Sequence, residues 1–322
     1  MTTFRPMNIE KDAEDMARLY NFTTNEMLNT DAIIDWWTPR EGEIRETRLA
    51  QDDHGTAIGY WDIDRETWMK PGYFKMKVVI APEARWQGLG SQMYRDAVHV
   101  ARKHGATHLE GYIREADTAS VRFAEKRGFK IVHHGFESTL DLTDFDEHRF
   151  DDLMARIRAQ EFYFFSLAEA GVTDENKRKL YEVNRDSGLD NPGNDETFPD
   201  FYAFSKDVFE ASWFRADTQI LAAYRESWVG LSAIGIYTED NHAYNAFTGV
   251  LREYRGRGLA QALKLQTILL AKREGMSYVR THNDSNNLPM LAVNRKLGYK
   301  PKRGYYHLLC VLDEASARPS EN

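Results

Sequence analysis

The sequence predicts an α/β (α+β) fold in which one structural unit occurs twice. A β-like apolar run, a turn rich in arginine and glycine, and a run of helix formers follow one another over residues 248–260 and again over residues 80–90. An apolar run that changes to helical composition across a glycine turn is typical of a strand–turn–helix unit. The repetition of this order predicts two domains of similar fold.

The two copies keep a constant separation in the sequence. The offset between Arg255 and Arg85 is 255 − 85 = 170, and the glycine three positions after each arginine keeps the same offset. A later glycine followed by an aromatic residue, at Gly128 and Gly298, again gives 298 − 128 = 170. We therefore expect an internal duplication, and 322 residues are enough for two domains that each bury a core.

The first half contains helical and strand patterns in alternation. Residues 8–24 carry apolar side chains at helical spacing, and residues 25–46 are expected to be helical in part. The further expected elements are strands at 57–62 and 74–80, a helix at 90–103, a strand at 109–113, a helix at 119–127 and a strand region at 130–142.

A polar run at residues 143–148 separates the halves, which predicts an N-terminal domain over residues 1–145 and a C-terminal domain over residues 146–322. The offset between the copies is smaller at the first helix than at the turn, so the second half has an insertion, which we place at residues 187–200. The elements expected in the second half are a helix at 150–158, a strand at 162–167, a helix at 174–185 and a helix at 259–272.

The glycine-rich turns are suited to binding an anion. A turn that leads into a helix presents several unpaired N–H groups and the positive end of the helix dipole to one point, which favours a phosphorylated cofactor. The alternative is that the glycines make a tight turn without a ligand. Repetition of the turn at constant spacing favours the first interpretation.

The pattern Arg-x-x-Gly-x-[Gly/Ala], with a hydrophobic strand before it and a Gly-[Phe/Tyr] step some forty residues later, resembles the GNAT superfamily of acyl-CoA-dependent N-acyltransferases. The second half is the closer match, through RGRGLA at 255–260 and the segment 281–301. Two such halves resemble the tandem GNAT proteins of the mycothiol synthase type. The resemblance implies two tandem domains, each a mixed, mainly antiparallel sheet flanked by helices.

The resemblance also implies which residues bind acetyl-CoA. In this family the strand before the turn, the turn and the first turn of the helix contact the co-substrate, and an asparagine near the following helix bonds its pantetheine arm or caps that helix. The residues at these positions are Thr248, Gly249, Val250, Arg255, Gly256, Arg257, Gly258, Leu259, Ala260 and Asn287 in the second half, and Val79, Ile80, Arg85, Gln87, Gly88, Leu89, Gly90 and Ser91 in the first.

The catalytic residues are less clear from the pattern. Many family members have a tyrosine five residues before the final aromatic residue, and it protonates the leaving thiolate. Asn294 and Ala124 stand at these positions. Asn294 could hydrogen-bond the sulfur or order a water and is a catalytic candidate, whereas Ala124 can do neither, so the first half is expected to be the less competent one. His282 and Glu239 are the candidate bases of the second half, with a hydrogen-bonded or exposed strand end as the alternative for the histidine.

The inserted loop is the one feature that concerns the acceptor. It carries Asp190, Asp195, Glu196 and Asp200, which would favour a cationic amine; the alternative is a solvated loop with helix-capping aspartates. The net charge of −8 and the pI of about 5.7 disfavour nucleic acid as a partner. Neither a membrane span nor a metal site is expected. We expect a cytoplasmic protein that is a monomer, with its two domains as a pseudo-dimer, or a homodimer.

The sequence thus predicts a tandem GNAT N-acyltransferase that uses acetyl-CoA, takes the primary amine of a small molecule as acceptor, and has its active site in the C-terminal half. A non-catalytic acyl-CoA-binding or regulatory protein is the alternative. The single cysteine, Cys310, lies in an apolar run and is expected to be a buried strand residue.

Overall fold

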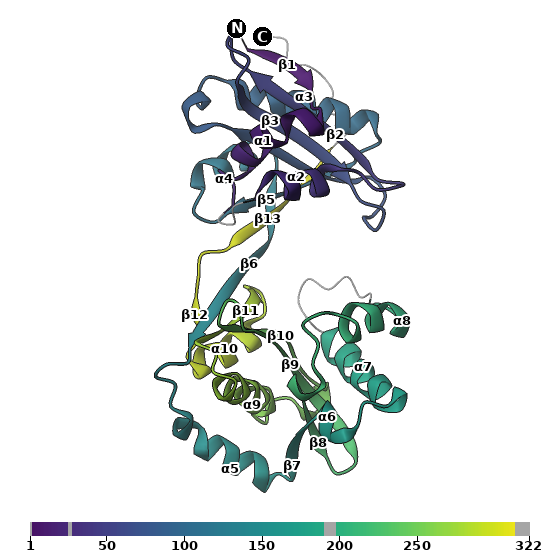
Figure 1. Ribbon diagram of the computed structural model, residues 1–322, viewed down its shortest axis with the longest axis vertical. Coiled ribbons are helices and arrows are strands. Elements are labelled where there is room, and N and C mark those ends of the chain that lie inside the picture. Colours follow the sequence, from purple (N-terminus) through teal and green to yellow (C-terminus); the bar gives the residue numbers. More distant parts are fainter. Residues whose placement is uncertain (1, 25–27, 190–197, 313–322) are drawn as a thin grey trace. The chain divides into compact units, whose positions relative to one another are not determined.

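The computed structural model describes residues 2–24, 28–189 and 198–312. They form two compact units (Figure 1): unit 1 comprises Met1–His134 and Gly304–Asn322, and unit 2 comprises Gly135–Arg303. The boundary expected between residues 145 and 146 lies within unit 2. As a division of the sequence into two halves, it stays a prediction.

Unit 1 contains a mixed, mainly antiparallel sheet. Its hydrogen-bonded order is β1-β2-β3-β4-β5-β13, followed by the first residues of β6, and β4 and β5 are the parallel pair. The strands are β1 (Thr3–Pro6), β2 (Ile44–Gln51), β3 (Ala57–Arg65), β4 (Tyr73–Ile80), β5 (His108–Arg114), β6 (Lys130–Asp141) and β13 (Tyr305–Val311).

Helices of unit 1 cover both faces of this sheet, because neighbouring strand residues enter different cores. Tyr60 packs with α1 and α2, whereas Trp61 packs with α3. Asn8 and Asn29 cap α1 and α2 by accepting hydrogen bonds from backbone N–H groups. The helices are α1 (Ile9–Tyr20), α2 (Thr30–Trp37), α3 (Leu89–Lys103) and α4 (Thr118–Glu125), with a 3₁₀ turn η1 (Pro82–Ala84).

Unit 2 repeats this arrangement. Its sheet has the order β6-β11-β10-β9-β8-β7, with β10 and β11 parallel and the short β12 paired to β6. The strands are β7 (Phe162–Ser166), β8 (Gln219–Tyr224), β9 (Ser227–Tyr237), β10 (His242–Val250), β11 (Tyr278–Asp284) and β12 (Lys300–Pro301).

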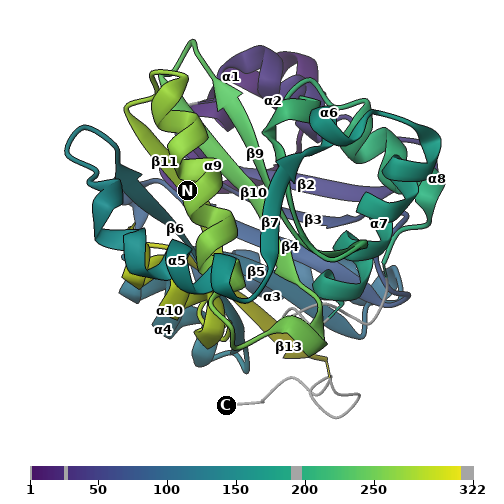
Figure 2. The same cartoon turned by 90° about the horizontal axis from the view of Figure 1, so that it is seen from below.

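Figure 2 shows α7 and α9 on opposite sides of β9 and β10. Helices α5 and α9 share one apolar core, and α6, α7 and α8 share another. No helix within the described ranges has the length and apolar character that a membrane crossing needs. The helices are α5 (Asp151–Ala159), α6 (Leu167–Ala170), α7 (Asp174–Gly188), α8 (Phe201–Phe204), α9 (Leu259–Arg273) and α10 (Leu288–Leu297), with short helical turns η2 (Glu147–Phe150), η3 (Ser205–Phe209), η4 (Ala216–Thr218) and η5 (Arg252–Tyr254).

The structure confirms the predicted α/β class and the duplication. Helices α3 and α9 begin at Leu89 and Leu259, and strands β5 and β11 begin at His108 and Tyr278. Both pairs are separated by the same offset as the two turns, since 259 − 89 = 170 and 278 − 108 = 170. Cys310 is buried in β13, as expected.

Strands β1 and β2 were not predicted. The sequence of β2, IRETRLAQ, is rich in charged residues, and residues 25–46 were expected to be helical in part. Its polar side chains are accommodated because Arg45 and Thr47 bond Asp62 on β3. Cross-strand ion pairs of this kind hide the apolar alternation on which a strand prediction depends.

The last strand of the chain belongs to the first unit. Every residue of β13 pairs antiparallel with β5, and Leu308 is buried in the core of unit 1. In turn, the Gly135–Asp141 portion of β6 pairs with β11, and Leu140 is buried in the core of unit 2. Figure 1 shows the yellow β13 beside the blue β5. Each unit is therefore completed by a strand from the other half of the sequence.

Candidate functional site

In unit 2 a glycine turn connects β10 to α9. Gly256 and Gly258 have φ values of +77° and +87°, in the left-handed region that glycine adopts without strain. Gly258 is the residue before α9 and provides no side-chain cap. The N–H groups of the first turn of α9 therefore lack acceptors within the helix and remain available to an anion.

The first arginine of each motif holds the turn against the preceding strand. Arg255 Nε donates to the carbonyl of Val250 at 2.9 Å, and Arg85 Nε donates to the carbonyl of Ile80 at 3.0 Å. The motif arginine thus has a structural contact that is the same in both units.

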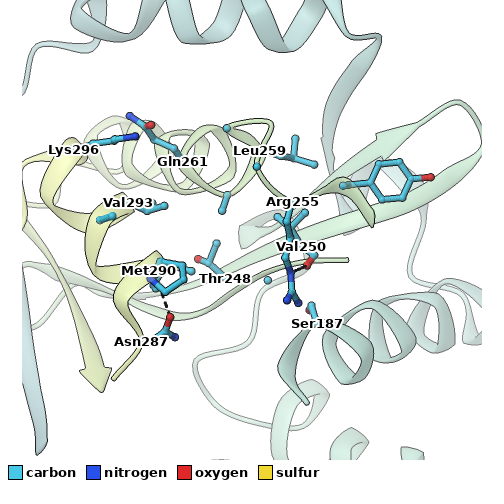
Figure 3. Close-up of a pocket in the computed structure, with 17 residues that line it drawn as sticks. Ser187, Thr248, Val250, Arg255, Leu259, Gln261, Asn287, Met290, Val293 and Lys296 are labelled. Atoms are coloured by element: carbon cyan, nitrogen blue, oxygen red, sulfur yellow. Dashed lines mark hydrogen bonds between the residues drawn. The ribbon is translucent and has the colours of Figure 1, made fainter. Parts of the chain in front are cut away.

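A cavity of about 360 Å³ opens at the turn of unit 2, between the N-terminus of α9, the end of β10 and one side of α10 (Figure 3). We call it the α9 groove. It brings together nine of the predicted cofactor residues with eight others: Thr248, Gly249, Val250, Arg255, Gly256, Gly258, Leu259, Ala260 and Asn287, and also Ser187, Tyr254, Gln261, Pro289, Met290, Ala292, Val293 and Lys296.

Arg257 is the predicted residue of this turn that does not line the α9 groove. Its guanidinium carbon lies 5.6 Å from the centre of the Tyr254 ring and 5.9 Å from that of Phe162. These contacts turn the side chain toward the aromatic residues of β7 and η5.

Polar groups in the α9 groove suit a phosphorylated ligand. Lys296 is exposed on α10 and adds a positive charge to the electropositive end of α9. Asn287 Oδ1 accepts from the N–H of Met290 at 3.2 Å and so caps α10 (Figure 3). Capping and a contact with the ligand are compatible, because the amide NH₂ of Asn287 makes no hydrogen bond to a described residue.

The residues of α10 that line the groove were not predicted from the sequence, apart from Asn287 at the start of the helix. Pro289, Met290, Ala292, Val293 and Lys296 follow helical spacing, so a single face of α10 is involved. The spacing was readable in the sequence, but which face points at the turn is decided by packing.

The first copy of the turn has a different environment. A cavity of about 130 Å³ lies between β4, β5 and α4. Among the residues predicted for the first copy, Val79 lines it, and the others do not: Ile80, Arg85, Gln87, Gly88, Leu89, Gly90 and Ser91. A Cβ atom on Gly90 would lie 3.5 Å from the ring of Phe123. Arg127 stacks 3.4 Å above that ring and donates to Ser91 Oγ at 2.7 Å. Phe123 and Arg127 therefore pack against the start of α3 and line one side of the smaller cavity.

A second difference is the residue that follows the motif arginine. Trp86 stands where unit 2 has Gly256, since 256 − 86 = 170. Its φ is +66°, and its side chain is 88% exposed. An L-residue in this conformation carries a cost of about 1–2 kcal/mol, so the first turn is less relaxed than the second.

The candidate base His282 lies where two parallel strands diverge. Pairing of β10 with β11 covers His242–Tyr244 and Tyr278–Arg280 and stops there. Two residues further along β11, His282 Nδ1 lies 3.0 Å from the Tyr244 hydroxyl. Burial raises the pKa of Tyr244 above its ordinary value. His282 itself is exposed and does not line the α9 groove.

The other two catalytic candidates do not line the groove. Glu239 is exposed in the turn between β9 and β10. Asn294 is buried in α10, and its Nδ2 donates to Asn283 Oδ1 at 2.6 Å. Asn283 donates in turn to Ser138 Oγ at 2.9 Å, so this amide chain ties α10 to the sheet. The catalytic roles given to these residues stay predictions.

The acidic loop is covered in part. Asp190, Asp195 and Glu196 lie outside the described residues. Asp200 accepts a hydrogen bond from the N–H of Ala203 at 2.9 Å and caps α8. For this residue the structure shows the helix-capping alternative.

Comparison with known proteins agrees with the repeated architecture. A family model described as the acetyltransferase (GNAT) family matches residues 12–129 and 178–299. No curated protein matches the chain.

Similar solved structures include a GCN5-related N-acetyltransferase from Sphaerobacter thermophilus, which has 18% identity, a TM-score of 0.66, and coverage of 96% of this chain and 95% of that chain. A tandem GNAT protein from the clavulanic acid biosynthesis pathway has 18% identity and a TM-score of 0.61, with 100% of both chains covered. A glucosamine N-acetyltransferase region of a fungal β-N-acetylglucosaminidase has 16% identity and a TM-score of 0.67, with 96% of this chain and 38% of that chain covered. At these identities the likeness concerns the fold.

Proposed function

The chain belongs to the acetyltransferase (GNAT) family, and we propose that it transfers the acetyl group of acetyl-CoA to a primary amine of a small molecule, with the working site in unit 2. The observation that carries this proposal is the α9 groove. Unpaired backbone N–H groups, glycines and a lysine line this one accessible cavity. At the first turn, by contrast, Phe123 and Arg127 pack beside Gly90 and Ser91, and the cavity that they line contains none of the residues of the turn.

Acetyl-CoA supplies an acyl group that is activated as a thioester. The N–H groups at the start of α9 are placed to hold its pyrophosphate, and Lys296 to balance the negative charge. Asn287 is placed to donate from its amide NH₂ to the pantetheine arm. The main chain of Thr248–Val250, at the end of β10, forms the wall of the groove along which that arm would extend.

We propose that His282 is the base that removes a proton from the acceptor amine. When His282 Nδ1–H donates to the Tyr244 oxygen, Nε2 keeps its lone pair and can accept a proton from the attacking amine. Tyr244 then fixes the ring and its tautomer. The leaving thiolate takes its proton from solvent or from the imidazolium that His282 has become, because the amide of Asn294 is not an acid and donates its hydrogen bond to Asn283.

The second candidate is a protein that binds acyl-CoA without turnover. Neither half has a tyrosine at the position from which many family members protonate the thiolate; Asn294 and Ala124 stand there. Such a protein would show affinity for acetyl-CoA but no transfer to any amine. Assay of acetyl transfer across a panel of small amines separates the two functions.

The proposed site is tested by a charge at Gly256. No atom lies within 4 Å of a Cβ placed there, and the first copy carries a tryptophan at this position, so the turn accepts a side chain. Gly256→Glu should weaken acetyl-CoA binding about tenfold or more by repulsion of the pyrophosphate, whereas Gly256→Gln, which has the same size and backbone strain, should have a much smaller effect.

Trp86→Glu is the matched variant in unit 1 and should leave affinity and acetyl transfer unchanged. The measurements are calorimetric titration with acetyl-CoA and steady-state transfer. Equal affinities of Gly256→Glu and wild type, or a loss with Trp86→Glu instead, would refute the assignment to unit 2.

A further inference from the structure

Unit 1 contains a second, larger cavity of about 540 Å³ on the side of β3 and β4 that faces α2. None of the predicted cofactor or catalytic residues lines it. Carboxylates, basic side chains and aromatic rings meet there, among them Asp62, Asp64, Lys77, Trp36, Trp37 and Tyr112. We call it the β3–β4 cavity.

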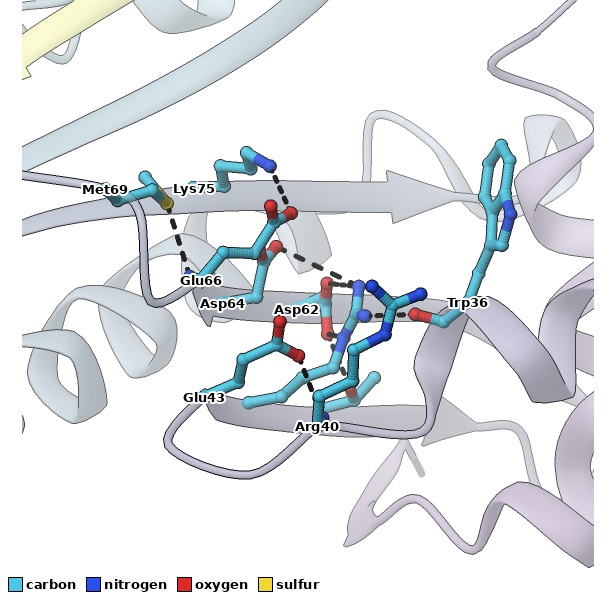
Figure 4. A network of polar contacts seen from close by, with 10 residues as sticks. Trp36, Arg40, Glu43, Asp62, Asp64, Glu66, Met69 and Lys75 are labelled. Atoms are coloured by element: carbon cyan, nitrogen blue, oxygen red, sulfur yellow. Dashed lines mark hydrogen bonds and ion pairs between the residues drawn. The ribbon is translucent and has the colours of Figure 1, made fainter. Parts of the chain in front are cut away.

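Several of its charges are paired with each other and form a fixed wall (Figure 4). Arg45 donates to both oxygens of Asp62, at 3.1 and 2.9 Å, and Thr47 also donates to Asp62. Lys75 pairs with Glu66 at 2.5 Å. These groups satisfy one another and need no ligand.

Two opposite charges in the cavity are left without full partners. Asp64 has Arg45 alone as an ion-pair partner among the described residues, at 3.9 Å, and its side chain is 15% exposed. Lys77 makes no hydrogen bond or ion pair with a described residue; its ammonium lies 4.2 Å from the centre of the Tyr20 ring. Burial raises the pKa of Asp64 to about 6 and lowers the pKa of Lys77 to about 8, as expected for charges with too little compensation.

Strand register places these two groups side by side. Asp64 lies opposite Lys75, and Asp62 lies opposite Lys77, so Asp64 and Lys77 are diagonal neighbours on one face of the sheet. Diagonal neighbours stand about 7–8 Å apart, with their Cβ atoms somewhat closer, so long side chains at such positions are within reach of each other. Because the lysine ammonium is carried on a flexible four-carbon stem, a ligand with an ammonium and a carboxylate on one carbon atom can contact both groups.

Aromatic residues line the cavity, and one of them, Trp37, carries a buried donor. Trp37 is 3% exposed, and its indole N–H has no acceptor among the described residues. A buried donor without an acceptor is costly and indicates that a polar atom is missing from its surroundings. Trp36 and Tyr112 are 53% and 55% exposed, although both are large aromatic residues. They offer apolar surface to a ligand.

The second copy lacks this arrangement. Gly235 and Phe247 stand at the positions that correspond to Asp64 and Lys77, because Ala233 pairs with Phe247 as Asp62 pairs with Lys77, and Gly235 pairs with Tyr244 as Asp64 pairs with Lys75. The charge pair is therefore a property of the first unit and not of the repeated fold.

We propose that the β3–β4 cavity binds a small zwitterion with an apolar side group, that is, a free amino acid or a compound of the same chemistry. Asp64 binds its ammonium group, Lys77 binds its carboxylate, and Trp36 and Tyr112 contact the apolar side group. This site does not depend on the function proposed for unit 2, since its residues all belong to unit 1.

The test uses three probes that share a phenyl ring: L-phenylalanine, 2-phenylethylamine, which has no carboxylate, and 3-phenylpropanoate, which has no amine. Each is titrated calorimetrically into the full chain at pH 7. We expect L-phenylalanine to bind at least about tenfold more tightly than either of the other two, because each charged contact contributes. No binding of L-phenylalanine, or equal affinity for all three probes, would overturn the proposal.

Two variants assign the contacts. Asp64→Asn should weaken L-phenylalanine and 2-phenylethylamine about tenfold and leave 3-phenylpropanoate unchanged; Lys77→Met should weaken L-phenylalanine and 3-phenylpropanoate and leave 2-phenylethylamine unchanged. Lys103→Met, exposed on α3, is the control for loss of a lysine. If either variant fails to fold, the comparison of the three probes on the wild-type chain decides the matter. Loss of all three probes in a folded variant would contradict the assignment.

Discussion

Lys264 is buried in the core of unit 2, where its ammonium lies 4.9 Å from the centre of the Tyr299 ring. It stands on α9 between Leu263 and Leu265, which are also buried. Burial lowers the pKa of Lys264 to about 7 and raises the pKa of the Tyr299 hydroxyl, which has no hydrogen-bond partner among the described residues. The core of unit 2 therefore contains a group whose charge is costly.

We predict that Lys264→Met stabilises the protein. The pKa of the folded state lies below the ordinary value of 10.5, so the unfolded chain binds more protons between pH 7 and 10.5. The free energy of unfolding then rises with pH across this window, by up to about 1.4 kcal/mol per pH unit, and the full cost of burial is present below pH 7. Methionine removes this contribution.

Urea denaturation between pH 6 and 10 measures the effect. The gain of Lys264→Met over wild type should be largest at pH 6–7 and should shrink toward pH 10. Lys272→Met, on the exposed side of the same helix, is the matched control. A variant whose stability follows the wild-type curve at every pH would show that Lys264 carries no such cost.

His282 and Tyr244 allow a kinetic prediction at the same scale. His282→Gln should lower kcat about 100-fold, because the acceptor amine loses its base. Tyr244→Phe should lower kcat about tenfold and shift the acid limb of the pH–rate profile, since it removes the group that orients the ring.

The KM for acetyl-CoA should stay within about twofold in both variants, because neither residue lines the α9 groove. Steady-state kinetics from pH 5 to 9 check both points. Full activity of His282→Gln would move the role of base to another residue.

The two strand–turn–helix elements have the same backbone and different surroundings. In both units the motif arginine bonds the end of the preceding strand, and the glycine three positions after it, Gly88 or Gly258, precedes the helix in the left-handed conformation. The side chains on and beside the next helix differ: Phe123 and Arg127 stand where the second half has Val293 and Leu297. The strand–turn–helix element therefore occurs in both units, whereas the presence of a groove beside it depends on the side chains of the next helix.

This difference predicts that the first turn can be opened. The triple variant Trp86→Gly, Phe123→Val and Arg127→Leu gives unit 1 the residues of unit 2 at these positions. Calorimetric titration should show the number of acetyl-CoA molecules bound per chain rise from one to two. A stoichiometry of one in the folded variant would mean that further residues close the first turn.

At the scale of the whole molecule, each unit needs a strand from the other half of the sequence. Leu308 is fully buried among core residues of unit 1, although it lies near the end of the chain. Leu308→Ala should cost about 2–5 kcal/mol and lower the hydrogen-exchange protection of β3, β4 and β5 more than that of β8 and β9.

Leu221→Ala is the matched variant in unit 2, since Leu221 is also fully buried, on β8. It should reverse the pattern and affect β8 and β9 first. Hydrogen exchange followed by mass spectrometry resolves these segments. Equal loss of protection throughout the chain in both variants would indicate that the units unfold together.

The duplication, the order of most helices and strands, and the two glycine turns could all be predicted from the sequence, whereas binding of a cofactor at the second turn stays a prediction. These features depend on local composition and spacing: glycines with positive φ, apolar runs, and helix formers that recur at a constant offset. Nine of the ten cofactor residues predicted in the second half line one groove, because a turn and the helix that follows it form from consecutive residues.

The remaining features depend on long-range contacts. The exchange of β6 and β13 rests on pairing between strands far apart in the chain, for which neither strand carries a local signal. The packing of Phe123 and Arg127 beside the first turn also depends on the tertiary structure. The same holds for the diagonal positions of Asp64 and Lys77, which strand register decides. A sequence pattern reports which residues neighbour each other along the chain, whereas a binding site depends on which residues the fold brings together in space.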